Sequence, residues 1–184
     1  EAEQVTARVR SYEPYRYDDP AARRGAWHVD VEDCSMALID FAGDVLVQWT
    51  WQGSAPGQGF NKKVIYGSEG CIDWESGVWN RAGKNTKTET LVREYMRSLK
   101  KDEREELFPG GVENPIATEL KEFAAAVRGD GTPEVDGLSG YRSQAICMAV
   151  LESSWFNRPV SLAEIERGDL EGYQAEIDRA LGIV

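Results

Sequence analysis

SMALIDFAGDVLVQWTW, residues 35–51, decides the fold class of this chain. It holds two runs, 35–41 and 44–51, that are rich in β-forming residues. In the second run four large apolar residues alternate and face one way: Val45, Val47, Trp49 and Trp51. Phe41-Ala42-Gly43-Asp44 between the runs predicts a tight hairpin turn. Strands joined this closely pair antiparallel, because parallel strands need a long crossover.

The rest of the first half also predicts strands with short connections. The predicted strands are EQVTARVRSY (3–12), AWHVDVE (26–32), NKKVIYG (61–67) and CIDWE (71–75). The link GSEG (67–70) predicts another turn, with glycine available where φ must be positive. We expect residues 13–26, which carry two prolines, to form a polar loop.

The second half predicts helices. The expected helices are 98–108, 115–128, about 138–156, a segment from 161, and a last one ending near 181. Asn114-Pro115 predicts an N-cap, Gly129 a C-terminal stop, and Ser161 with Glu164 a capping box. The helix 138–156 is apolar nearly all round, so we expect the sheet to cover one side and helix 115–128 another. Strands followed by helices predict an α+β fold: an open, mainly antiparallel sheet with helices packed on one face.

Composition excludes several classes of protein. With 184 residues the chain has room for one domain, and its net charge of −11 argues against nucleic acid and anionic membranes as partners. No apolar run approaches the length of a membrane span, and no signal pattern opens the chain. Three widely spaced cysteines and a single histidine argue against a zinc site, and we expect free thiols in a reducing, cytoplasmic compartment.

The order of motifs in the second half resembles one known family. Thr132-Pro133, Asp136-Gly137, Glu152-Ser153 and Arg158-Pro159-Val160 match the C-terminal domain of the Gfo/Idh/MocA oxidoreductases in order and spacing. The stretches VEDCSMALIDFAGDVLVQWTW and VIYGSEGCIDW are similar to the sheet of that family. The resemblance covers about residues 4–170. It implies that residues 1–184 form a single domain with the fold of the glyceraldehyde-3-phosphate-dehydrogenase-like C-terminal domains.

The resemblance also implies what a complete enzyme of this family contains. Such an enzyme binds NAD or NADP on an N-terminal Rossmann domain with a glycine fingerprint. This sequence has no such fingerprint, no Glu-Lys-Pro and no Gly-Gly…Asp-x-Gly-x-His segment. We therefore expect the Rossmann domain and the catalytic residues to be absent from this chain, which would neither bind the cofactor nor transfer hydride alone. The parent enzyme would act on a sugar, a polyol or a related small molecule.

The loop SAPGQGFNK (54–62) is the best candidate for substrate contact. In relatives the corresponding loop reaches toward the substrate. Gln58 and Asn61 would hydrogen-bond hydroxyl groups, and Phe60 would pack on a ring face. A plain connecting loop is the alternative interpretation. Lys62 and Lys63 would point to opposite faces of a strand, where solvated charges are favoured over a phosphate or carboxylate contact.

Other residues are weaker candidates. His28 suggests a general base, but a surface or capping histidine is favoured. Asp30, Glu32 and Asp33 suggest a metal site, which the family pattern disfavours. Trp49 and Trp51 favour core or interface packing over sugar stacking. Large apolar residues on an open sheet face predict a homo-oligomer formed through that face.

Two further hypotheses stay open. The chain would be a free-standing, non-catalytic dimeric scaffold or regulatory domain derived from this family. Alternatively, the parent enzyme would use its cofactor for epimerisation or glycoside cleavage, as some relatives do. The residues that separate these reactions are not in this sequence.

Overall fold

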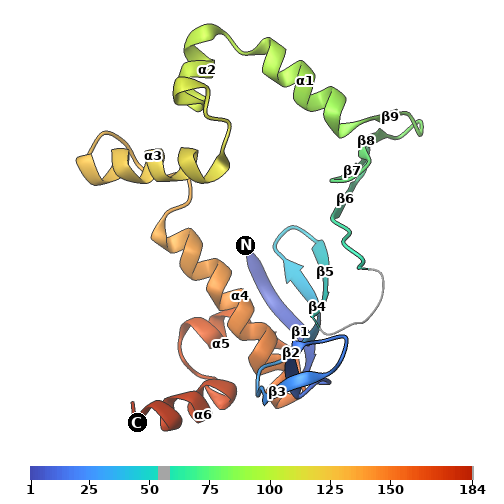
Figure 1. Ribbon diagram of the computed structural model, residues 1–184, viewed down its shortest axis with the longest axis vertical. Helices are drawn as coiled ribbons and strands as arrows, with labels where there is room; N and C mark the ends of the chain where they lie inside the picture. The colour runs from blue at the N-terminus through green and yellow to red at the C-terminus, as the bar shows by residue number, and fades with distance from the viewer. Residues whose placement is uncertain (54–58, 184) are drawn as a thin grey trace. The chain divides into compact units, whose positions relative to one another are not determined.

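The computed structural model describes residues 1–53 and 59–183 and divides into two compact units (Figure 1). The terminal unit comprises residues 1–57 and 135–184, and the middle unit comprises residues 58–134. Each unit has its own four-stranded antiparallel sheet. The mixture of open antiparallel sheets and helices confirms the α+β class.

The terminal unit contains most of the strands. Its elements are β1 (Ala2–Arg10), β2 (Tyr15–Asp19), β3 (Arg24–His28), β4 (Cys34–Phe41), β5 (Val45–Gln52), α4 (Gly137–Phe156), β10 (Val160–Ser161), α5 (Leu162–Glu166) and α6 (Gly172–Leu181). The main sheet has the order β10-β1-β4-β5, and every pair is antiparallel. The predicted hairpin 35–51 is therefore confirmed as β4 and β5. Its turn needs left-handed backbone at Gly43 and Asp44, which have φ of 80° and 60°.

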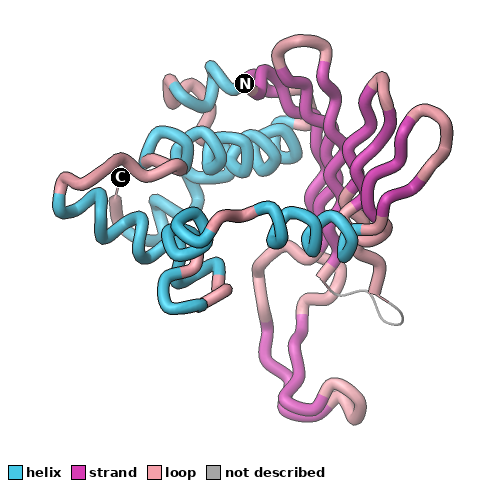
Figure 2. The backbone as a smooth tube through the Cα atoms, turned by 90° about the horizontal axis from the view of Figure 1, so that it is seen from above, coloured by secondary structure: helices cyan, strands magenta, loops and turns pink. Residues whose placement is uncertain are grey.

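The core of the terminal unit lies between β1, β4 and α4. Val5 and Ala7 of β1 and Ala37 and Ile39 of β4 are buried with Ala145 and Ala149 of α4. Small residues on both sides let the helix approach the strands closely. Figures 1 and 2 show α4 lying beside β1 as a second layer. The prediction that the sheet covers one side of this helix is confirmed.

Two serines at the end of α4 complete the outer edge of β1. The short β10 pairs only with Gln4 and Val5. Farther along the same strand, the Ala7 N–H donates to Ser153 Oγ at 2.9 Å and the Val9 N–H donates to Ser154 Oγ at 2.8 Å. Ser153 is fully buried and its hydroxyl donates to the carbonyl of Arg158 at 2.7 Å. Helix side chains thus replace a partner strand, as buried backbone donors require.

Glu152, one residue earlier, caps the start of α6. Its side chain is 1% exposed and accepts hydrogen bonds from the backbone N–H of Tyr173 at 3.1 Å and of Gln174 at 3.4 Å. Free N–H groups at a helix start give the side-chain oxygens of Glu152 the hydrogen-bond partners that a buried polar group requires. Gly172 allows this close contact, because a Cβ there would lie 2.4 Å from the ring of Trp155.

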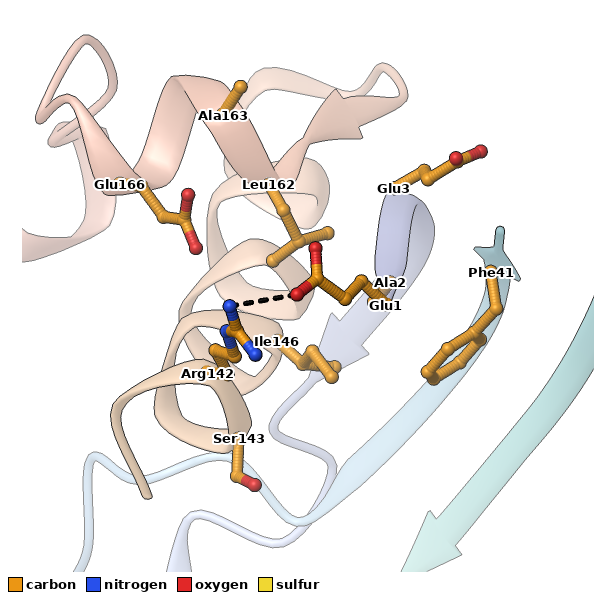
Figure 3. A pocket seen from close by; sticks show the side chains of 10 residues that line it. All are labelled: Glu1, Ala2, Glu3, Phe41, Arg142, Ser143, Ile146, Leu162, Ala163 and Glu166. Atoms are coloured by element: carbon orange, nitrogen blue, oxygen red, sulfur yellow. Dashed lines mark ion pairs between the residues drawn. The ribbon is translucent and has the colours of Figure 1, made fainter. Parts of the chain in front are cut away.

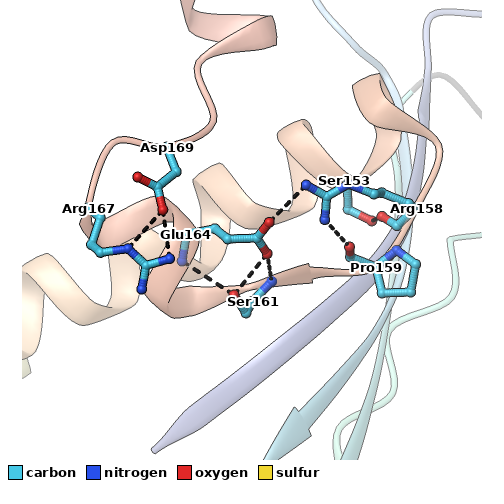
Figure 4. A network of polar contacts seen from close by, with 7 residues as sticks. All are labelled: Ser153, Arg158, Pro159, Ser161, Glu164, Arg167 and Asp169. Carbon is cyan, nitrogen blue, oxygen red and sulfur yellow. Dashed lines mark hydrogen bonds and ion pairs between the residues drawn. The ribbon is translucent and has the colours of Figure 1, made fainter.

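A polar network joins the end of α4 to α5 (Figure 4). The predicted capping box is present: Ser161 Oγ accepts from the Glu164 N–H, and Glu164 accepts from the Ser161 N–H. Arg158 Nη2 lies 2.8 Å from Glu164 Oε1. This hydrogen bond with Arg158, followed by those from Ser161, lowers the pKa of Glu164 to about 2.

The expectation of a polar loop at 13–26 was wrong. Residues 15–28 form the antiparallel pair β2–β3, with Tyr15 opposite His28 and Tyr17 opposite Ala26. The prolines at 14 and 20 flank β2 and do not interrupt it. Strand β3 ends at His28, earlier than the predicted strand 26–32. The alternation Tyr-Arg-Tyr carries the β signal that the surrounding charges and prolines obscure.

The middle unit combines a small sheet with helices. Its elements are β6 (Val64–Gly67), β7 (Gly70–Asp73), β8 (Gly77–Asn80), β9 (Asn85–Thr86), α1 (Thr88–Ser98), α2 (Lys101–Leu107), the 3₁₀ turn η1 (Pro109–Gly111) and α3 (Pro115–Arg128). Asn114 caps α3 by accepting from the Ile116 N–H, and Gly129 ends it with a φ of 80°, as predicted. The strands β8 and β9 and the helix α1 were not predicted from the sequence. Because α3 and α4 belong to different units, the predicted packing of α3 on α4 stays a prediction.

We expect Ser153→Ala to lower the free energy of unfolding by about 1–3 kcal/mol, because it leaves the buried Ala7 N–H without its acceptor. Chemical denaturation with an unchanged m-value measures the loss. Ser143→Ala is the matched control on the same helix, since that hydroxyl is exposed and only bonds the carbonyl of Ser139. Equal stability of the two variants would contradict the role of Ser153.

We expect Glu164→Gln to cost stability in a pH-dependent way. The folded pKa of Glu164, about 2, lies below its ordinary 4.5, so the stabilisation is complete above pH 4.5. It is lost as the pH falls through about 2. Melting temperatures of the wild type and the variant should therefore converge on acidification, and Arg158→Met should reproduce the effect. A difference that persists unchanged at pH 2 would exclude the ion pair as its source.

Candidate functional site

The described residues of the predicted contact loop are exposed and lie just before β6. Phe60 is 90% exposed and Asn61 is also exposed, so both side chains are accessible to a ligand. Gln58 lies outside the described residues. The structure thus keeps Phe60 and Asn61 together at one end of the small sheet.

Lys62 ties this loop to the turn between β7 and β8. Its Nζ lies 2.5 Å from Oδ2 of Asp73, a side chain buried at the end of β7. Asp73 also accepts from Ser76 Oγ at 2.7 Å and from the Glu75 N–H at 3.1 Å. In addition, the Trp74 N–H donates to the carbonyl of Lys63 at 3.1 Å. Side chain and backbone together fix the two residues that follow Phe60 and Asn61.

The electrostatics of this pair show what Lys62 is able to do. The hydrogen bond with Asp73 raises the pKa of Lys62, and the hydrogen bonds from Lys62 and Ser76 lower the pKa of Asp73. Both groups therefore stay ionised at neutral pH, and Lys62 is not a proton acceptor there. The sequence favoured a solvated lysine at this position. The finding differs for Lys62, because the buried carboxylate of Asp73 holds its ammonium group.

The register of the small sheet separates two kinds of surface. Ile65, Ile72 and Val78 lie opposite one another on one face. The other face, here called the polar–aromatic face, carries five residues from the three main strands and β9: Tyr66, Cys71, Asp73, Trp79 and Asn85. Successive side chains along a strand alternate between faces, so this division follows from the pairing alone.

Trp79 is held in place on the polar–aromatic face. Its indole Nε1 donates to Ser76 Oγ at 3.2 Å, and Asn85 Nδ2 donates to the Ser76 carbonyl at 3.1 Å. Because Ser76 donates in turn to Asp73, hydrogen bonds run from the indole through Ser76 and Asp73 to Lys62. Sequence reasoning missed Asp73, Ser76 and Asn85. The available signal was Asp73-Trp-Glu-Ser76, the spacing with which an aspartate closes a turn on nearby donors.

The weaker candidates in the terminal unit, His28 and Asp33, make contacts within the fold. His28 is exposed and packs edge-on against Tyr15, with ring centroids 5.7 Å apart. Asp33 is buried and accepts from the N–H groups of Tyr12 and Glu13 at 2.9 and 2.7 Å. Burial, and then a hydrogen bond with Glu32, raise the pKa of Tyr173 to about 12. Within residues 1–53 and 59–183 no cluster of acidic, cysteine or histidine side chains could hold a metal ion.

The two tryptophans of β5 lie on the same face of the main sheet as its core. Trp49 is opposite Ala37 and Trp51 opposite Ser35, and Trp49 Nε1 donates to Ser35 Oγ at 3.0 Å. Both tryptophans remain half exposed. The apolar residues on the opposite, open face are Met36, Leu38 and Leu46.

A cavity of about 440 Å³ lies in the terminal unit between β1, β4, α4 and α5 (Figure 3). Phe41, Ile146 and Leu162 supply apolar walls. Arg142 also lines the cavity. Its Nη2 lies 2.8 Å from Glu1 Oε1, so its guanidinium group is already paired with a carboxylate. Neither Phe60 nor Asn61 lines this cavity.

Known structures share this fold over most of the chain. An oxidoreductase domain protein from Kribbella flavida is 17% identical with a TM-score of 0.62, over 88% of this chain and 46% of its own. An oxidoreductase from Agrobacterium radiobacter, solved with NAD+, L-tartaric acid and magnesium, is 14% identical with a TM-score of 0.58, over 90% and 44%. The WlbA dehydrogenase from Bordetella pertussis, solved with NADH and UDP-GlcNAcA, is 16% identical with a TM-score of 0.57, over 87% and 42%. The chain thus spans less than half the length of these structures.

The family of the chain follows from its match to a family model, since no curated protein matches the chain. Among the described residues, none of the helices has the length and apolar character needed to cross a bilayer. The model of the oxidoreductase family's C-terminal alpha/beta domain matches residues 1–162, which include parts of both compact units. The chain therefore belongs to the Gfo/Idh/MocA oxidoreductase family, as its C-terminal domain.

Proposed function

We propose that this chain is the substrate-binding and oligomerisation domain of an NAD(P)-dependent oxidoreductase that acts on a sugar, a polyol or a related small molecule. The observation that carries the proposal is the family match over residues 1–162, combined with an exposed loop that Lys62 and Asp73 fix in place. Similar structures were solved with NAD+ and L-tartaric acid, with NADH and UDP-GlcNAcA, and, for a levoglucosan dehydrogenase, with NADH and L-sorbose. These ligands support a small hydroxylated substrate.

The contact loop would orient the substrate. Phe60 offers an aromatic face to the C–H surface of a sugar ring, and the Asn61 amide both donates and accepts hydrogen bonds with hydroxyl groups. Gln58, outside the described residues, would add a second amide. Because Lys62 and Lys63 are bound to Asp73 and Trp74, binding would cost less conformational entropy than it would in a free loop.

The cofactor would belong to the parent enzyme. NAD or NADP accepts or donates the hydride, and we propose that this chain alone binds neither and is not catalytic. The lack of a glycine fingerprint in the sequence supports this proposal. We further propose that residues 1–184 act as one domain. A cytoplasmic location is supported by three free cysteines, since reducing compartments keep thiols free.

The oligomer would form through the open face of the main sheet. Met36, Leu38 and Leu46 are 51%, 48% and 64% exposed there and alternate with polar residues such as Gln48. Exposed apolar residues that gather on one face are typical of protein interfaces.

We expect sugars or polyols, with their acid derivatives included, to give saturation-transfer NMR signals with the 184-residue chain, and NADH to give none. Phe60→Ala should lower the affinity for the sugar by about fivefold, because the contact with the aromatic ring is lost. Asn61→Ala should also lower this affinity. Ile65→Ala, on the aliphatic face of the small sheet, is the control and should bind as the wild type does. A panel without any bound member would overturn the proposed substrate class.

We expect Leu38→Lys to convert a self-associating chain into a monomer in sedimentation experiments, because a charge would be buried in the interface. Val45→Lys, equally exposed but on the other face of the sheet, is the matched control and should leave the oligomer intact. A wild type that sediments as a monomer, or a dimer that tolerates Leu38→Lys, would contradict this interface.

A further inference from the structure

The polar–aromatic face of the small sheet continues the contact loop. Lys62 immediately follows Phe60 and Asn61, and its ammonium group is bonded to Asp73 on that face. The same hydrogen-bonded chain continues through Ser76 to Trp79, whose side chain is 39% exposed. A fixed and half-exposed indole that is linked through Ser76 and Asp73 to the ammonium group of Lys62 has the chemistry that recognises a sugar. The indole face suits the C–H surface of the ring, and the polar groups suit its hydroxyls.

The charges on this face argue against an anionic ligand. The cation of Lys62 is already neutralised by Asp73, which is 7% exposed. A carboxylate or phosphate that captured Lys62 would leave a buried carboxylate without its counter-ion, which is costly. Glu75 also interacts with Lys62 electrostatically and brings a second negative charge close to the same ammonium group. Asp73, Glu75 and Lys62 together carry a net negative charge.

The neighbouring residues add one further ion pair. Lys63 lies just before β6, and its backbone carbonyl accepts a hydrogen bond from the Trp74 N–H. Arg81, beyond the end of β8, lies 4.0 Å from Glu69 and is also paired. Two cations of the small sheet, Lys62 and Arg81, are thus paired with carboxylates, those of Asp73 and Glu69.

We propose that the surface formed by Phe60, Asn61, Lys62 and Trp79 binds an uncharged hydroxylated ring, a neutral sugar or cyclic polyol, and discriminates against sugar acids and sugar phosphates. The proposal rests on the proposed function, because it specifies the substrate class of the same loop. Asp73 is its specificity-determining residue, since this carboxylate withholds Lys62 from an anion. Trp79 extends the site beyond the predicted loop.

The test compares matched neutral and charged probes on the 184-residue chain. D-glucose, D-glucuronate and D-glucose 6-phosphate, and likewise D-galactose and D-galacturonate, are titrated in ligand-observed NMR at pH 7. The wild type should bind the neutral members more tightly. Asp73→Asn frees the charge of Lys62 and should shift the preference toward the acids by about fivefold. The double variant K62M/D73N removes both charges and should return the preference to neutral sugars.

Two tryptophan variants test where on the small sheet the sugar binds. Trp79→Ala should abolish or strongly weaken binding of the neutral sugar. Trp74→Ala should retain it, because Trp74 is also half exposed but lies in the turn after β7, outside the hydrogen-bonded chain that links Trp79 through Ser76 and Asp73 to Lys62. If Asp73→Asn alone fails to give a folded chain by circular dichroism, the wild-type preference and the double variant still decide the question.

The outcomes separate the two levels of the proposal. Tighter binding of the acids by the wild type, or an unchanged preference in Asp73→Asn, overturns the discrimination but leaves the proposed function standing. Equal binding by Trp79→Ala and Trp74→Ala overturns the location. Absence of binding by every probe overturns the proposed function, and this inference with it.

Discussion

The terminal unit depends on how the last turns of α4 meet β1. Three consecutive side chains accept hydrogen bonds from backbone N–H groups of other elements. Glu152 accepts from the Tyr173 N–H at the start of α6, Ser153 from the Ala7 N–H, and Ser154 from the Val9 N–H. Each gives a partner to a backbone donor that is buried, in the case of Ala7, or partly buried. The small residues Ala145 and Ala149 place the helix close enough to the sheet for these short side chains to reach.

The middle unit uses the same principle with an ionised group. Asp73 gathers a lysine ammonium from the segment before β6, and a serine hydroxyl and a backbone N–H from the turn after β7, around a single carboxylate. This arrangement orders both the exposed loop before β6 and the indole of Trp79. A site assembled from so few strands gains its order from such a polar centre, because the sheet has little apolar volume to bury.

The sequence predicted best where local chemistry alone determines the backbone. The hairpin at Gly43 and Asp44, the cap at Asn114 and the box of Ser161 and Glu164 all follow from side chains within a few positions of their partners. The pair β2–β3 was missed because its aromatic alternation is embedded among charges and prolines. The partner of Lys62 was not predicted, for a different reason. Its partner lies eleven positions away, and only the pairing of β6 with β7 brings the two together.

The two edges of the main sheet differ in kind. At β1 the serine hydroxyls and β10 occupy the outward donors, so another chain finds no template there. In the described part of the chain β5 pairs only with β4, and its residues VLVQWTWQ contain no charge and no proline. Such features leave a strand edge competent for further pairing. Within the terminal unit the β1 edge is therefore closed by its own side chains, whereas β5 carries none of the charges or prolines that discourage strand addition.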